Sequence, residues 1–153
     1  MDWLAAMVEA SQLGAFARGS SWAYPAANLI HLLGLVLLVG GIGIVDLRLI
    51  GLFPALPLDP VVRALTPLAI AGLALMALSG PILFAADATA LARSGTFAWK
   101  LGLIAVALAN AAGFRWLWRR EAFRDRPLQR LMAGASIALW LSIAALGRMI
   151  AYS

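Results

Sequence analysis

The chain contains one histidine, His31, and it lies inside a long apolar stretch that runs from Asn28 to Gly51. A neutral imidazole has one nitrogen that donates a hydrogen bond and one that accepts a hydrogen bond or binds a metal ion. His31 could therefore hold a metal centre, or it could hydrogen-bond to a neighbouring helix. The sequence has no cysteine, which excludes disulfides and thiolate metal sites.

Two cations, Lys100 and Arg148, also lie in apolar surroundings. The uncharged runs from Lys100 to Arg115 and from Arg130 to Arg148 are each shorter than the ~20 residues that a membrane span needs. Both cations must then lie within the membrane or at its edge. Their long side chains can extend toward headgroup phosphates, but an ionisable residue inside a membrane is also a functional-site hypothesis.

Hydrolytic chemistry has little support, because no nucleophile and base, carboxylate pair or HExxH pattern can be assembled around a single histidine. A copper or small-ion conduit is a further alternative, since methionines supply soft ligands. These methionines are scattered and form no Met-x-x-Met pair, and a cationic entrance favours anions over metal ions. They are Met7, Met76, Met132 and Met149.

The composition explains why these polar residues stand in apolar runs. Hydrophobic residues make up 63% of the chain and charged residues only 12%. The mean hydropathy is +0.92. These values exclude a water-soluble domain and indicate an integral membrane protein.

Four segments are long and apolar enough to cross a bilayer as helices: 25–49, 61–86, 96–118 and 127–150. The short connections between them predict an all-α, four-helix up-down bundle in which residues 1–153 form a single transmembrane domain. Residues 3–18 are too polar to span and predict an amphipathic helix in the membrane interface, with Trp3 and Trp22 as aromatic anchors. The alternative is a disordered N-terminus.

Basic residues predict the orientation of the spans. Six arginines flank the connection between the third and fourth spans, which should therefore face the cytoplasm and leave the chain N-out and C-out. The net charge of +5 comes mostly from this region and matches anionic lipid rather than nucleic acid. The six are Arg115, Arg119, Arg120, Arg124, Arg126 and Arg130.

This topology places the polar residues in one leaflet. His31 lies roughly 9 Å along the first span from its outer end. The second span returns to a similar depth at residues 79–81, and Lys100 and Arg148 lie near the outer ends of the third and fourth spans. We therefore expect His31, Lys100 and Arg148 to lie close together on the outer side.

The helix faces around these residues allow two interpretations. Gly34 and Gly41 follow His31 on one face, where small residues either make room for a flat cofactor or let another helix approach closely. Asn110 shares a face with Lys100 and needs a hydrogen-bond partner inside the bundle. Trp140 lies on the side of the fourth span that carries Arg148, and it is either the wall of a planar ligand site or part of the core.

The remaining acidic residues predict ion pairs at the two membrane surfaces. At the inner end of the first span, Asp46 and Arg48 should compensate each other together with Arg63. At the outer rim, Asp87 should pair with Lys100 or Arg93.

Four blocks carry a resemblance: HLLGLVLLVGGIGIVDLRLIG from His31, SGPILFAADA from Ser79, FAWKLGLIAVALANA from Phe97 and GRMIAY from Gly147. They resemble a family of small, uncharacterised bacterial four-span membrane proteins. More distantly, the histidine before a Gly-rich helix and the K-x9-N spacing of Lys100 and Asn110 are similar to copper-resistance membrane proteins of the D type. They are similar also to the haem-binding membrane protoporphyrinogen oxidase. The resemblance implies the bacterial inner membrane, with His31 as a haem or metal ligand and Lys100 as a site lysine.

Two main hypotheses follow for the function. In the first, the chain is a b-type haem protein in membrane electron transfer: His31 binds iron, Lys100 and Arg148 pair with the haem propionates, and Gly34 and Gly41 admit the porphyrin edge. The sixth iron ligand is then Met76, Met149, an open position or a second protomer's histidine. In the second, it is a non-enzymatic membrane subunit or structural homo-oligomer in which His31 takes part in helix packing.

Overall fold

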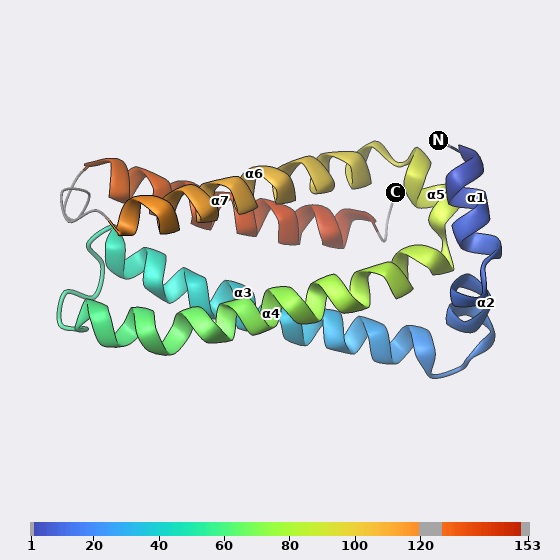
Figure 1. Ribbon diagram of the computed structural model, residues 1–153, viewed down its shortest axis with the longest axis horizontal. Helices are drawn as coiled ribbons and strands as arrows, with labels where there is room; N and C mark the ends of the chain where they lie inside the picture. Colours follow the sequence, from blue (N-terminus) through green and yellow to red (C-terminus); the bar gives the residue numbers. More distant parts are fainter. Residues whose placement is uncertain (1, 120–126, 151–153) are drawn as a thin grey trace.

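The structure is a computed structural model that describes residues 2–119 and 127–150, all of its regular elements being helices. Three of the predicted arginines, Arg120, Arg124 and Arg126, lie outside the described residues. Figure 1 shows the helices along the chain. They are α1 (Asp2–Ala10), α2 (Gln12–Gly19), α3 (Ala23–Leu49), α4 (Leu58–Ala86), α5 (Ala88–Arg93), α6 (Gly95–Trp118) and α7 (Pro127–Met149).

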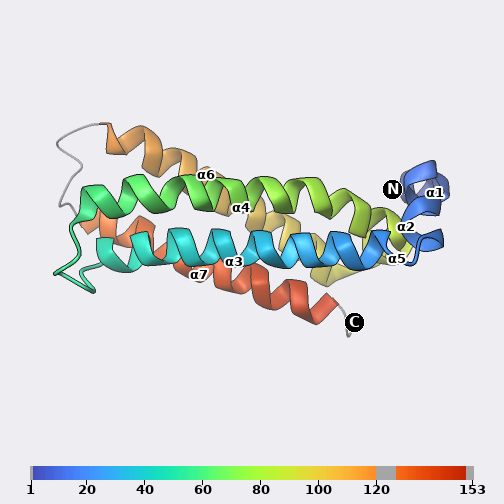
Figure 2. The ribbon, with the colours of Figure 1, turned by 90° about the horizontal axis from the view of Figure 1, so that it is seen from below.

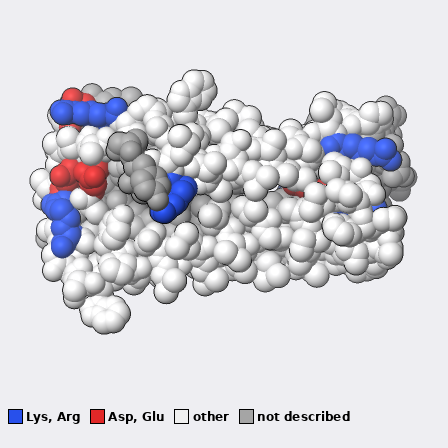
Figure 3. Space-filling view, turned by 180° about the vertical axis from the view of Figure 1, so that it is seen from behind, with Lys and Arg blue, Asp and Glu red and all other residues white. Residues whose placement is uncertain are grey.

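Four of these helices, α3, α4, α6 and α7, are long and apolar enough to cross a membrane. In Figure 3 most of the charged side chains lie near the two ends of the visible face, and apart from one blue side chain farther in and a small red patch the long middle section is white. Exposed aromatic side chains occur near both ends, Trp22 and Trp99 at one and Trp116 at the other, as in the aromatic belts of membrane proteins. The chain is a multi-pass membrane protein, and the predicted all-α four-helix architecture is confirmed.

The span boundaries differ from the prediction by up to three residues. The helix α4 begins at Leu58 rather than at residue 61, because Pro60 lies in the first turn, where its missing N–H breaks no helical hydrogen bond. The helix α3 ends as predicted at Leu49. Gly51 follows with a φ of 105°, and the N–H of Leu52 donates to the carbonyl of Leu47 at 3.0 Å, a pairing that closes the last turn.

The N-terminal prediction of one helix over residues 3–18 was wrong in one respect: two helices form, with a break at Ser11. The Ser11 hydroxyl accepts a hydrogen bond from the backbone N–H of Gly14 at 3.3 Å and so caps α2. A second difference is α5, which forms in the segment predicted as the loop 87–95.

The long helices form two antiparallel pairs, α3 with α4 and α6 with α7, which lie as two layers in Figure 1. The layers are joined mainly by α3 and α7, whereas α4 and α6 contact each other little. Phe84 and Phe97 stack between α4 and α6 with ring centroids 5.5 Å apart. The central core contains Leu38, Ala69, Ala107, Trp140 and Ile143.

The short helices α1, α2 and α5 lie together across one end of the bundle, here named the cap, as Figure 2 shows from below. Arg18 of α2 donates to the carbonyls of Ala85 and Ala86 at 3.3 and 3.4 Å, which are acceptors left open at the end of α4. The opposite end, named the arginine end, carries Arg63, Arg115, Arg119 and Arg130.

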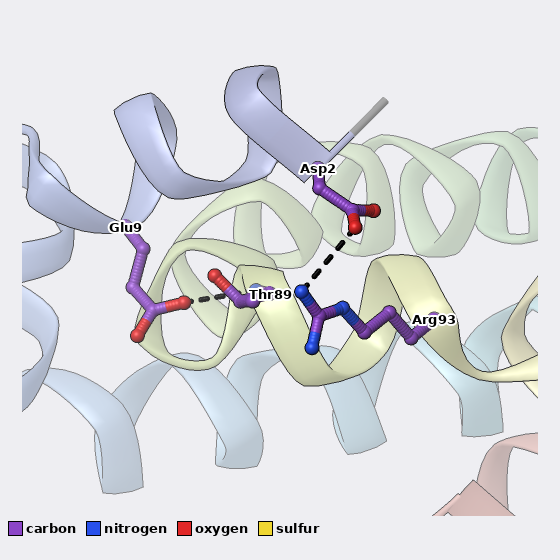
Figure 4. A network of polar contacts seen from close by, with 4 residues as sticks. All are labelled: Asp2, Glu9, Thr89 and Arg93. Carbon is purple, nitrogen blue, oxygen red and sulfur yellow. Dashed lines mark hydrogen bonds and ion pairs between the residues drawn. The ribbon is translucent and has the colours of Figure 1, made fainter.

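Two polar contacts join α1 to α5 within the cap (Figure 4). A carboxylate oxygen of Glu9 accepts a hydrogen bond from the backbone N–H of Thr89 at 2.8 Å, and Arg93 pairs with Asp2 at 3.2 Å. Hydrogen bonding from Thr89 holds the pKa of Glu9 below its usual value. The predicted pairing of Asp87 with Lys100 or Arg93 was therefore wrong: among the described residues Asp87 forms an ion pair with neither, and Arg93 pairs with Asp2 on another helix.

Candidate functional site around His31

The imidazole of His31 is hydrogen-bonded across the α3–α4 interface. Its Nδ1 lies 2.9 Å from the hydroxyl oxygen of Ser79, which also lies 2.7 Å from the carbonyl oxygen of Leu75 on its own helix. A serine hydroxyl has one hydrogen, and back-donation to the carbonyl four residues earlier is its common use within a helix. The Ser79 oxygen then accepts from Nδ1–H, so the proton of neutral His31 lies on Nδ1.

This tautomer leaves the lone pair of the other ring nitrogen, Nε2, without a hydrogen-bond partner among the described residues. Such a nitrogen can accept a hydrogen bond or bind a metal ion. The side chain of His31 is half-buried, whereas Ser79 is only 2% exposed. The imidazole is therefore fixed at one nitrogen, and its other nitrogen has no hydrogen-bond partner among the described residues.

Lys100 lies near His31, although the two residues are on different helix pairs. It is close enough for its charge to act on the imidazole. A β-carbon added at Gly147 of α7 would lie 3.4 Å from the Lys100 ammonium nitrogen, so the glycine leaves the space that this half-buried side chain uses. The structure thus brings Lys100 to His31 from α6, while Arg148, the residue after Gly147, is exposed on α7.

The space next to Gly34 and Gly41, the two glycines that follow His31 on α3, is occupied by atoms of the neighbouring helix. A β-carbon at Gly34 would lie 2.7 Å from the carbonyl oxygen of Gly72, and one at Gly41 would lie 3.0 Å from the carbonyl oxygen of Leu65. Both neighbours belong to α4, so these glycines bring two helix backbones together. This geometry favours helix packing over admission of a porphyrin edge.

Asn110 and Trp140 lie deeper in the bundle. Asn110 is ten residues from Lys100, or about 15 Å along α6, and its side-chain nitrogen donates to the carbonyl of Met132 at 3.1 Å. Trp140 is 5% exposed and packs in the central core with Leu38 and Ile143. Neither is therefore at the level of His31: Asn110 connects α6 to α7, and Trp140 fills the core.

Asp46 is the residue that the sequence reasoning placed incorrectly. It is 4% exposed, it hydrogen-bonds with the Ser136 side chain of α7, and its Oδ2 has no partner among the described residues. Arg48 donates instead to the carbonyls of Leu56 and Pro54, at 2.6 and 3.4 Å. The predicted charge compensation was therefore wrong.

One sequence signal could have found this burial. Gln129 and Ser136 are seven residues apart on one face of the fourth span, and both are buried in the structure. A polar stripe on that face needs a polar partner, and Asp46 at the matching depth of the first span supplies it.

The described residues contain no group of three or more His, Asp or Glu side chains that could hold a metal ion. No family model, curated protein or solved structure matches the chain.

Proposed function

We propose that this multi-pass membrane protein is a non-enzymatic subunit or structural homo-oligomer of the bacterial inner membrane, in which His31 fixes α3 to α4. The observation that carries this proposal is the 2.9 Å hydrogen bond between His31 and Ser79. It lies one turn from Gly34, where the backbones of α3 and α4 are in contact.

The physical argument rests on how helices associate in lipid. Lipid tails are as apolar as leucine, so helices associate through close packing and interhelical hydrogen bonds rather than through the hydrophobic effect. Gly34 and Gly72 supply the close packing, and His31 with Ser79 supplies the hydrogen bond. Together they make α3 and α4 a stable pair on which the cap can rest.

The arginines support the N-out, C-out orientation as part of this proposal. Arg63, Arg115, Arg119 and Arg130 gather at the end opposite the cap, and basic residues near short loops face the cytoplasm. The His31 site then lies on the outer side.

A b-type haem protein is the second candidate, and it is favoured by the Nε2 of His31, which has no hydrogen-bond partner among the described residues. A histidine that binds a metal usually donates its other N–H to an acceptor, as Nδ1 does here to Ser79. Lys100 would hold a propionate by charge. Haem would supply one-electron transfer, but the described residues offer a single imidazole and no slot at Gly34 or Gly41. They therefore fit one axial ligand and only part of a pocket.

The test is an oxidised-minus-reduced visible spectrum of protein expressed with haem supplied and purified in mild detergent. The variant His31→Ala removes both roles, whereas Ser79→Ala removes the hydrogen bond and keeps the possible ligand. The proposal predicts colourless protein in every case, with both variants losing thermal stability. A reducible Soret band that is lost in His31→Ala and kept in Ser79→Ala would overturn the proposal and establish haem binding.

A further inference from the structure

At the arginine end, a groove of about 460 Å³ opens between α4 and α6. It exists because these two helices belong to different antiparallel pairs and contact each other little. In a membrane such a gap is filled either by lipid or by a neighbouring protein. The lining residues are Val62, Arg63, Thr66, Pro67 and Ile70 of α4 and Arg115 of α6.

The charges of the groove favour an anion. Arg63 and Arg115 come from two different helices, and both are exposed. Neither forms an ion pair within the described part of the chain, although Asp59 is only one turn before Arg63. Two guanidinium groups at one opening suit a phosphate, which accepts the forked hydrogen bonds of arginine.

The remaining wall favours a lipid over a free ion. Val62, Pro67 and Ile70 give it an apolar surface that an acyl chain can cover. Two guanidinium donors and an apolar wall thus line the same groove.

We propose that this groove binds an anionic phospholipid, with its phosphate between Arg63 and Arg115 and an acyl chain along α4. Basic pockets between membrane helices bind anionic headgroups in this way. A second groove at the same end, lined by Ile50, Pro127, Arg130 and Leu131, contains one arginine and offers an internal comparison.

The experiment is native mass spectrometry of delipidated protein titrated with phosphatidylglycerol or phosphatidylcholine. The wild type should bind its first phosphatidylglycerol molecule at least about tenfold more tightly than its first phosphatidylcholine molecule, because each arginine near the headgroup contributes binding free energy to the anionic lipid. The double variant Arg63→Gln, Arg115→Gln should lose this preference. The matched control, Arg119→Gln with Arg130→Gln, removes the same charge from the same end and should keep it.

A third variant tests the groove itself. Thr66→Trp fills the space without changing the charge, so it should weaken the first binding event while both arginines remain. Equal losses in the two charge variants would overturn the proposal in favour of diffuse surface attraction. Full displacement of phosphatidylglycerol by inorganic phosphate would overturn the lipid as occupant, and equal binding of both lipids would overturn the site.

Discussion

Replacing Gly34 with alanine should force α3 and α4 apart. The added β-carbon would lie 2.7 Å from the Gly72 carbonyl oxygen and 2.8 Å from Cγ of Met76, whereas ordinary contact begins at 3.4 Å. The helices must therefore separate by about 0.7 Å at this level, or the backbone must deform. Overpacking of this kind costs about 1–3 kcal/mol of unfolding free energy. The separation also lengthens the hydrogen bond from His31 to Ser79.

The assay is reversible unfolding in mixed micelles with increasing SDS, followed by circular dichroism. Gly40→Ala is the matched control, because a β-carbon there meets nothing within 4 Å. Its unfolding free energy should stay within about 0.5 kcal/mol of the wild type or rise, as expected for a substitution that makes no clash and favours the helix. Equal unfolding free energies for the two variants would refute the close contact of α3 and α4.

Two further predictions concern the other polar groups. At alkaline pH, where the carboxyl group is ionised, Asp46→Asn should raise the unfolding free energy by about 1 kcal/mol or more, because it removes a buried negative charge and keeps a carbonyl oxygen for Ser136. An equal or lower unfolding free energy for the variant at that pH would contradict the cost of burying this charge. The hydrogen bonds from Thr89 lower the pKa of Glu9 in the folded protein. The contribution of Glu9 to the stability of the cap is therefore complete when the pH is above the pKa of Glu9 in the unfolded chain. It is lost as the pH falls through the lower pKa of Glu9 in the folded protein. The Thr89 amide chemical shift should follow that lowered pKa in the wild type and show no such step in Glu9→Gln; a midpoint at the usual glutamate pKa would contradict the contact.

The spans could be predicted closely because lipid imposes a simple rule on the backbone. Each long apolar run must form a helix that satisfies its own hydrogen bonds, so length and hydropathy were sufficient for α3, α4, α6 and α7. The proximity of His31 and Lys100 could be predicted from their depth in the membrane alone. The hydrogen bond between His31 and Ser79 could not be predicted in this way, because the depth of a residue gives its level in the membrane but not the direction in which it points around the helix axis.

The predictions for Gly34, Gly41 and Asp46 were incomplete or wrong for the same reason, because the sequence does not give the rotation of a helix about its axis. Gly34 and Gly41 mark a face where something approaches closely, but a glycine pattern does not say whether that neighbour is a helix or a cofactor. Asp46 was assigned to the surface because it is near a helix end, whereas its rotation turns it toward α7. The cap helix α5 is too short for periodicity to distinguish it from a loop.

The measurement that tests the central claim most directly is a double-mutant cycle on His31 and Ser79 in the micelle unfolding assay. It compares the unfolding free energies of the wild type, His31→Ala, Ser79→Ala and the double variant. A hydrogen bond between the two side chains predicts a coupling free energy of about 0.5–1.5 kcal/mol. Strictly additive losses would contradict the account, because they would mean that His31 does not fix α3 to α4 through Ser79.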